Sequence, residues 1–298
     1  MSVIISFYQN TMKQKLSVSM ILVFAKGGKA KMKNILVRIV FMCFCLLIIG
    51  LISTNISYAK VNAKSIMGMW LLDEGSGDTV KDSSGNGNHG TIVASKWADG
   101  KIGKGIEFDG TGHVEIPASK TTDDIFNGFT YLLWVKPTSA PPNVNTRVIE
   151  RDWHNPTIQI GNAPTDFYGS IAVNADQAST NVRGGIWKMN EWSFVALTYD
   201  GANLVLYVNG EQVNEKKNVG EPDKKSHSAT PPANQGSIWF GSWKAVGWSF
   251  IGVIDEVGVF NVPLAVEDIK DVMNNGLQKA SAVSSVDKMA VTWGDIKK

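Results

Sequence analysis

Cysteine is nearly absent from the 298-residue chain, which contains only Cys43 and Cys45. Both cysteines lie inside an apolar run near the N-terminus. We therefore expect the chain beyond residue 60 to have no disulfide bond, no thiolate metal site and no thiol nucleophile.

Acidic residues are missing from residues 1–59, which contain seven of the 29 lysines and arginines and none of the 27 acids. The chain beyond them has 22 basic and 27 acidic residues, a net charge of −5. Because binding to nucleic-acid phosphates depends on a surplus of basic side chains, we expect no nucleic-acid partner.

Long apolar runs are scarce as well, and the run at residues 39–52 is only 14 residues long. That length is typical of the hydrophobic centre of a secretory signal peptide and is short for a membrane span. Ser57 and Ala59 supply the small side chains that signal peptidase requires. We expect residues 32–59 to be a signal peptide, residues 1–31 to be additional upstream sequence, and the protein to be secreted or displayed at the cell surface. An uncleaved N-terminal membrane anchor is the alternative.

Beyond residue 60 the chain consists of short apolar segments separated by Gly, Asn, Asp and Pro. This pattern predicts an antiparallel sandwich or barrel. Asn209 and Gly210 predict a tight hairpin that leads into residues 211–216. Apolar residues at helical spacing after Leu264 predict one short C-terminal helix that ends at Gly276, followed by a polar tail at residues 277–298. The predicted strands are residues 68–72, 113–116, 129–136, 147–150, 170–173, 192–198, 203–208, 237–240 and 251–260.

The segment at residues 250–261 (FIGVIDEVGVFN) contains the most informative acid of the sequence. Strict alternation places Asp255 on the same strand face as Val253, Val257 and Val259, while the other face is also apolar, so the strand is expected to be central. A carboxylate in such surroundings needs an arginine, several backbone N–H groups or a metal ion as its partner.

Several segments occur in an order that resembles a known family. The chain resembles the laminin-G-like members of the concanavalin A-like lectin/glucanase superfamily over a domain that we place at residues 60–276. The resemblance implies a jelly-roll sandwich of two antiparallel sheets, with a structural calcium ion near a sheet edge. The segments that carry it are residues 69–75 (MWLLDEG), 82–90 (DSSGNGNHG), 108–110 (FDG), 129–137 (FTYLLWVKP), 192–199 (WSFVALTY), 206–210 (LYVNG) and 254–257 (IDEV).

Calcium binds six to eight oxygen ligands, which combine carboxylates with backbone carbonyls. By resemblance the ligands would come from Asp73, from the turn of Asp109 and Gly110, and from Asp255. The alternative is that Asp255 pairs with Arg147, with Arg151 or with backbone donors.

The ten tryptophans suggest a carbohydrate ligand, because sugars stack their C–H faces on exposed aromatic rings. Some tryptophans lie in segments rich in glycine or asparagine, where they either line a groove or pack loops onto the sandwich. The candidate ligand-binding residues are Arg151, Asp152, Trp153, His154, Trp187, Trp243 and Trp248.

Catalytic signatures are missing: the sequence contains no G-x-S-x-G, no H-E-x-x-H and no phosphate-binding glycine loop. Asp255 and Glu256 are adjacent, so strand alternation directs them to opposite faces, whereas a glycosidase needs two acids that flank one bond. We therefore expect a secreted, non-catalytic binding module for a glycan. A protein-binding adhesion module is the alternative, and a divergent glycoside hydrolase is the least favoured reading.

Overall fold

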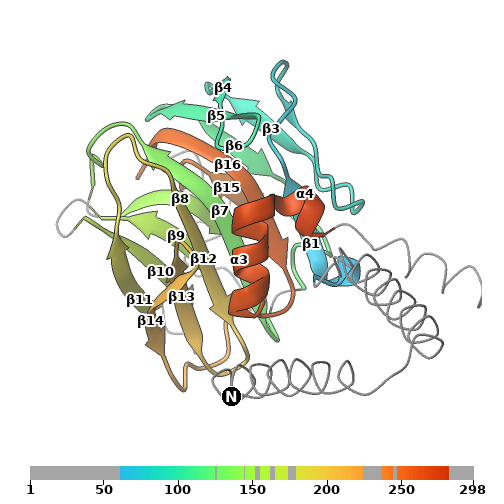
Figure 1. The fold of residues 1–298 in the computed structure, drawn as a ribbon, viewed down its shortest axis with the longest axis vertical. Helices are drawn as coiled ribbons and strands as arrows, with labels where there is room; N and C mark the ends of the chain where they lie inside the picture. The colour runs from blue at the N-terminus through green and yellow to red at the C-terminus, as the bar shows by residue number, and fades with distance from the viewer. Residues whose placement is uncertain are drawn as a thin grey trace, which may run out of the picture. The chain divides into compact units, whose positions relative to one another are not determined.

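The structure is a computed structural model that describes residues 61–124, 126–143, 145–151, 155–161, 165–173, 179–223, 236–243 and 247–281. In these ranges the chain forms two antiparallel sheets that pack face to face, as predicted (Figure 1). The two-sheet antiparallel sandwich expected from the sequence is therefore confirmed.

The first sheet has the strand order β14-β13-β12-β7-β16-β5-β4, and β1 also pairs with β16. β16 therefore lies in the middle of the sheet, as its two apolar faces predicted. The strands of this sheet are β1 (Ile66–Trp70), β4 (Lys96–Asp99), β5 (Lys104–Asp109), β7 (Phe129–Pro137), β12 (Ser193–Tyr199), β13 (Leu204–Val208), β14 (Glu211–Lys216) and β16 (Ile251–Phe260).

The second sheet has the order β11-β10-β9-β8-β15-β6-β3-β2. Ile149, Ile158 and Phe167 from this sheet share one buried cluster with Tyr131 and Val135 from the first sheet. Burial of each such side chain contributes about 1.5–3 kcal/mol, so this apolar layer holds the sheets together. The strands are β2 (Thr79–Val80), β3 (Gly90–Val93), β6 (His113–Ile116), β8 (Thr146–Arg151), β9 (Thr157–Ile160), β10 (Asp166–Ala172), β11 (Ser179–Ile186) and β15 (Ile238–Phe240).

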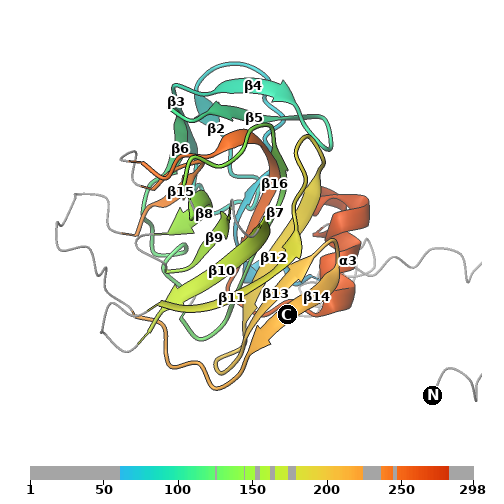
Figure 2. The same ribbon diagram turned by 90° about the vertical axis from the view of Figure 1, so that its left-hand side faces the viewer.

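Helix α3 (Val266–Asn275) covers the outer face of the first sheet (Figure 2). Ile269 and Val272 of this helix join a second buried cluster with Leu132 and Phe194 of the sheet. The predicted C-terminal helix is thus present, and the second sheet lies on the side of the sandwich away from it. Within the described residues, no helix has the length and apolar character to cross a membrane.

The expected polar tail begins later than the sequence suggested. Residues Leu277–Ala280 form a short second helix, α4, in which Leu277 and Ala280 are buried. The packed domain therefore continues past Gly276 to at least Ser281. A three-residue 3-10 turn, η1 (Ala63–Ser65), precedes β1.

A β-bulge in β16 changes the alternation that the sequence predicted. The pairing of β16 with β7 shifts between Asp255 and Gly258, and Glu256 has a left-handed φ of 50°. The extra residue reverses the side-chain direction beyond it. Val257 and Val259 consequently point into the core between the sheets with Ile254, and not to the face that Asp255 occupies.

Candidate ligand-binding site

A polar row crosses the outer face of the second sheet. Cross-strand pairing joins Glu115 to Trp239, Trp239 to Glu150, Glu150 to Thr157, and Thr157 to Ser170. Each of these strands has an adjacent residue in the core, such as Val114, Ile149 and Ile158, so the row faces away from it. The row therefore concentrates hydrogen-bonding side chains on the sandwich face opposite to α3.

Most of this row is closed to solvent and already paired. Glu150 is fully buried and accepts a charge-assisted hydrogen bond of 2.7 Å from Arg147 Nε, whose Nη1 donates to Gln159 Oε1 at 3.1 Å. The His113 ring lies 5.2 Å from the Trp239 ring, and burial lowers the pKa of that histidine. The centre of the face is thus a buried layer in which Arg147 holds Glu150 and Gln159, while Trp239 Nε1 has no hydrogen-bond partner among the described residues; it does not offer a free binding surface.

Glu115 and Glu150 are the two acids of this row, and they lie two strands apart with Trp239 between them. Two strand spacings put their backbones about 10 Å apart. Paired glycosidase acids need an open space between them for the sugar or for water. Because Trp239 occupies the intervening position and Glu150 is held by Arg147, this pair does not have the arrangement of a catalytic dyad.

The accessible aromatic surface lies beside Arg147. The rings of Trp243 and Trp248 are 5.2 Å apart in an edge-to-face arrangement, and the Arg147 guanidinium lies 5.6 Å from the Trp248 ring centroid. Trp248 is 40% exposed, which is unusual for so large an apolar side chain. We call these three residues, Arg147, Trp243 and Trp248, the tryptophan corner.

The backbone around the tryptophan corner holds Trp248 in a strained conformation. Its φ of 50° lies in the left-handed region, which bulky residues rarely adopt. The Trp248 carbonyl accepts a 2.8 Å hydrogen bond from the Arg147 N–H, while Trp243 N–H donates to the Gly247 carbonyl at 3.1 Å. Strain of this kind costs about 1–3 kcal/mol and is concentrated in proteins at functional sites.

The core anchors the base of the same segment. Phe250 is fully buried and packs against Phe108 of β5 with ring centroids 6.3 Å apart. The Phe250 N–H donates to the Gly241 carbonyl at 2.8 Å, which closes the base of the connection between β15 and β16. The exposed Trp248 ring is therefore two residues from a side chain that is anchored in the core.

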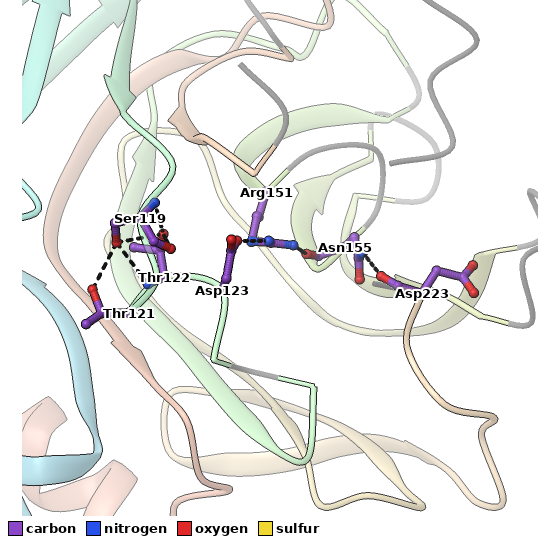
Figure 3. Close-up of polar contacts among 7 residues, drawn as sticks. All are labelled: Ser119, Thr121, Thr122, Asp123, Arg151, Asn155 and Asp223. Carbon is purple, nitrogen blue, oxygen red and sulfur yellow. Dashed lines mark hydrogen bonds and ion pairs between the residues drawn. The ribbon is translucent and has the colours of Figure 1, made fainter. Parts of the chain in front are cut away.

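Arg151 was predicted to contact a ligand, but the structure gives it a structural role (Figure 3). It is buried, forms an ion pair with Asp123, and donates from Nη1 to the Asn155 carbonyl at 3.2 Å. The Asn155 side chain in turn donates to the Asp223 carbonyl. Arg151 therefore joins three chain segments and presents no free donor to solvent.

Trp187 was also predicted to line the ligand surface, and this is wrong. The side chain belongs to the core cluster, and its Nε1 donates to the Gly161 carbonyl at 2.8 Å. The glycines before it in the sequence gave no information on the direction of the ring. The candidates Asp152, Trp153 and His154 lie outside the described residues.

Asp109 lies apart from Asp255, the other residue of β5 and β16 that was predicted to bind calcium. Asp109 pairs with Ile251, four residues before Asp255 in β16, a separation of about 13 Å along the strand. One calcium ion contacts its oxygens at about 2.3–2.6 Å and so cannot reach both. Asp109 instead accepts hydrogen bonds from the N–H and hydroxyl of Thr111, in the turn that contains Gly110.

Backbone N–H groups donate hydrogen bonds to the other two acids, Asp255 and Asp73. Asp255 Oδ2 accepts hydrogen bonds from Lys101 and Ile102 at 2.8 and 2.9 Å, and Asp73 Oδ1 accepts one from Lys104 at 2.8 Å. Across the ranges that the structure describes, no three His, Cys, Asp or Glu side chains are grouped to hold a metal. In the structure Asp255 is therefore paired with backbone N–H donors, which was the alternative to a metal ion.

A family model described as the concanavalin A-like lectin/glucanases superfamily matches residues 108–270. This match covers more than half of the chain. The chain belongs to the concanavalin A-like lectin/glucanase superfamily. The predicted laminin-G-like resemblance is therefore confirmed, while a comparison with curated protein sequences found no match.

Several solved structures have a similar fold. Domain 4 of AbnA, a GH43 extracellular arabinanase from Geobacillus stearothermophilus, in complex with arabinotriose, is 21% identical with a TM-score of 0.51; the match covers 70% of this chain and 98% of that domain. The binding domain of Paraclostridial Mosquitocidal Protein 1 is 13% identical with a TM-score of 0.53 and coverages of 71% and 52%. The binding domain of Botulinum Neurotoxin DC in complex with SialylT is 14% identical with a TM-score of 0.52 and the same coverages. At these identities the likeness shows the fold alone.

Sequence reasoning found both rings of the tryptophan corner but not Arg147, which it considered only as a partner for Asp255. The position of Arg147 beside Trp248 depends on an isolated bridge between residues 147 and 249, which are far apart in the sequence. No local pattern could have indicated that contact.

Proposed function

We propose that this superfamily member is a secreted, non-catalytic module that binds a glycan at the tryptophan corner. The observation that carries the proposal is the exposed Trp248 ring, held at a left-handed φ against Trp243 and Arg147. A rigid aromatic face loses little conformational entropy when a sugar ring stacks on it. Helix α3 covers the outer face of the other sheet, which leaves the opposite side of the sandwich for a ligand.

The fold neighbours support a sugar ligand, because two of them are described in complex with arabinotriose and SialylT. A protein ligand is the second candidate, since a related binding domain of Botulinum neurotoxin DC is described in complex with rat synaptotagmin II. The two candidates differ in whether isolated oligosaccharides bind.

The test is a glycan array followed by calorimetric titration of the best oligosaccharide with the full chain. Trp248→Ala is expected to weaken binding about two- to tenfold, because one aromatic stacking contact contributes about 0.5–1.5 kcal/mol. Trp192→Ala is the matched control, because this partly buried tryptophan packs against the first sheet and not at the tryptophan corner. Lys136 Nζ lies 5.0 Å from the centroid of its ring.

Equal affinities of Trp248→Ala and the unchanged protein would contradict the proposed site. Absence of oligosaccharide binding, together with capture of a purified extracellular protein that Trp248→Ala abolishes, would favour the adhesion module.

A further inference from the structure

The loop at residues 100–104 (GKIGK) contacts two acids that come from distant parts of the chain. Lys101 and Ile102 donate their backbone N–H groups to Asp255 in β16, and Lys104 donates to Asp73 after β1. Asp255 Oδ1 accepts a further N–H, from Glu256 at 2.8 Å. Asp255 and Asp73 are the side chains that the family resemblance assigns to a calcium ion.

Glycines let this loop approach the carboxylates. A Cβ atom on Gly100 would lie 2.6 Å from Asp255 Oδ2, and one on Gly103 would overlap Asp73 Oδ1. Gly103 also has a φ of 65°, in the left-handed region. The close contact at Gly100, and the contact and the left-handed φ together at Gly103, require a residue without a side chain. The loop is therefore shaped around the two acids.

The N–H groups occupy most of the lone pairs of Asp255 and one of those of Asp73. Three backbone donors already point at the Asp255 carboxylate, and the positive ends of these N–H dipoles would repel a cation placed beside it. Three such bonds offset part of the cost of burying this carboxylate. Calcium would have to break them and still collect six to eight oxygens.

We infer that the loop at residues 100–104 replaces calcium as the partner of Asp255 and Asp73, so that the fold of this module is independent of calcium. We call the loop and its two acids the amide clamp. The clamp ties β4, β5 and β16 to the segment after β1 with neutral donors. The module then keeps its structure, and any ligand surface that the fold supports, in calcium-poor surroundings.

The first test compares the full chain in EDTA with the full chain in millimolar calcium chloride. We expect the same Tm within about 1 °C and no calcium uptake by calorimetric titration at the clamp. Saturable uptake that raises Tm and disappears in both Asp255→Asn and Asp73→Asn would overturn the inference. Uptake that both variants retain and that leaves Tm unchanged would place calcium elsewhere and support the inference, whereas uptake elsewhere that raises Tm would overturn the independence of the fold from calcium. Asp73 is exposed, so its variant is expected to fold even where Asp255→Asn does not.

The second test measures the loop itself with a matched pair of glycines. Gly103→Ala and Gly77→Ala both place a Cβ at a residue with a left-handed φ, of 65° and 77° respectively. The new Cβ would overlap Asp73 Oδ1 at position 103, whereas nothing lies within 4 Å of it at position 77. We expect Gly103→Ala to lower Tm at least twice as much as Gly77→Ala, in EDTA and in calcium alike. Equal losses would show that the approach to Asp73 contributes nothing and would overturn the clamp.

Discussion

The Asp255→Asn substitution tests whether the buried carboxylate makes stability depend on pH. Burial raises the pKa of Asp255 from 3.8 to about 7, against the opposing effect of the N–H group of Ile102. The carboxyl group of Asp255 therefore binds its proton more tightly in the folded protein than in the unfolded chain. The contribution of protonated Asp255 to the free energy of unfolding is fully present below pH 3.8 and is lost as the pH rises through 7.

The size of the effect follows from the pKa difference. A shift from 3.8 to about 7 corresponds to about 4 kcal/mol between pH 4 and pH 8, because one pKa unit is about 1.4 kcal/mol. The asparagine variant carries no titrating group at this position. We expect its free energy of unfolding, minus that of the unchanged protein, to rise by about 4 kcal/mol over this range.

Urea unfolding followed by tryptophan fluorescence, with EDTA in every buffer, measures this difference. Glu256, whose pKa is also raised by burial, titrates in both proteins, so its own contribution largely cancels. A difference that stays constant with pH would refute the argument. A difference that falls with rising pH would show that a cation or another counter-charge holds the carboxylate ionised.

Three further substitutions separate structural from binding roles. Tyr131→Phe should raise the free energy of unfolding by about 1 kcal/mol, because the buried Tyr131 hydroxyl has no hydrogen-bond partner among the described residues; a loss of stability in urea unfolding would contradict this. Arg151→Ala should lower that free energy by about 2–4 kcal/mol, since it removes the ion pair with Asp123, while the affinity of the folded protein for an oligosaccharide stays unchanged in calorimetric titration. Trp187→Phe should lower the free energy of unfolding by about 1–2 kcal/mol through loss of the hydrogen bond to Gly161, again without a change in affinity. Weaker oligosaccharide binding by the Arg151 or the Trp187 variant would show that the substituted residue contributes to the ligand surface.

The sequence predicted the strands that carry strong apolar patterns and missed those that depend on a neighbour. β7 and β12 are almost wholly buried, so their composition alone identifies them. β5 was missed because Gly105 interrupts it, and that glycine is needed where a Cβ would lie 2.9 Å from the Ile254 carbonyl of β16. Such a close approach is visible only when both strands are in place.

The candidate site was predictable to a similar extent. The surroundings of Asp255 predicted a buried carboxylate, and the structure shows it fully buried. The choice among arginine, metal and backbone donors was not predictable, because the donors Lys101 and Ile102 lie 154 and 153 residues away in the sequence. For the tryptophans, polar neighbours indicated a loop but not the direction of each ring, which separates Trp248 from Trp187.

The pairing of β1 with β16 also determines how the module would carry a mechanical load. The N-terminal end of β1, Ile66, lies opposite Phe260 at the C-terminal end of β16, whereas Trp248 precedes the other end of β16. A force applied between the chain before β1 and a ligand on the tryptophan corner would pull the two strands past each other along their length. In that direction all hydrogen bonds of the ladder bear the load together, because they run perpendicular to the strands. Tension on a held ligand would therefore be resisted in shear and not by opening one bond after another.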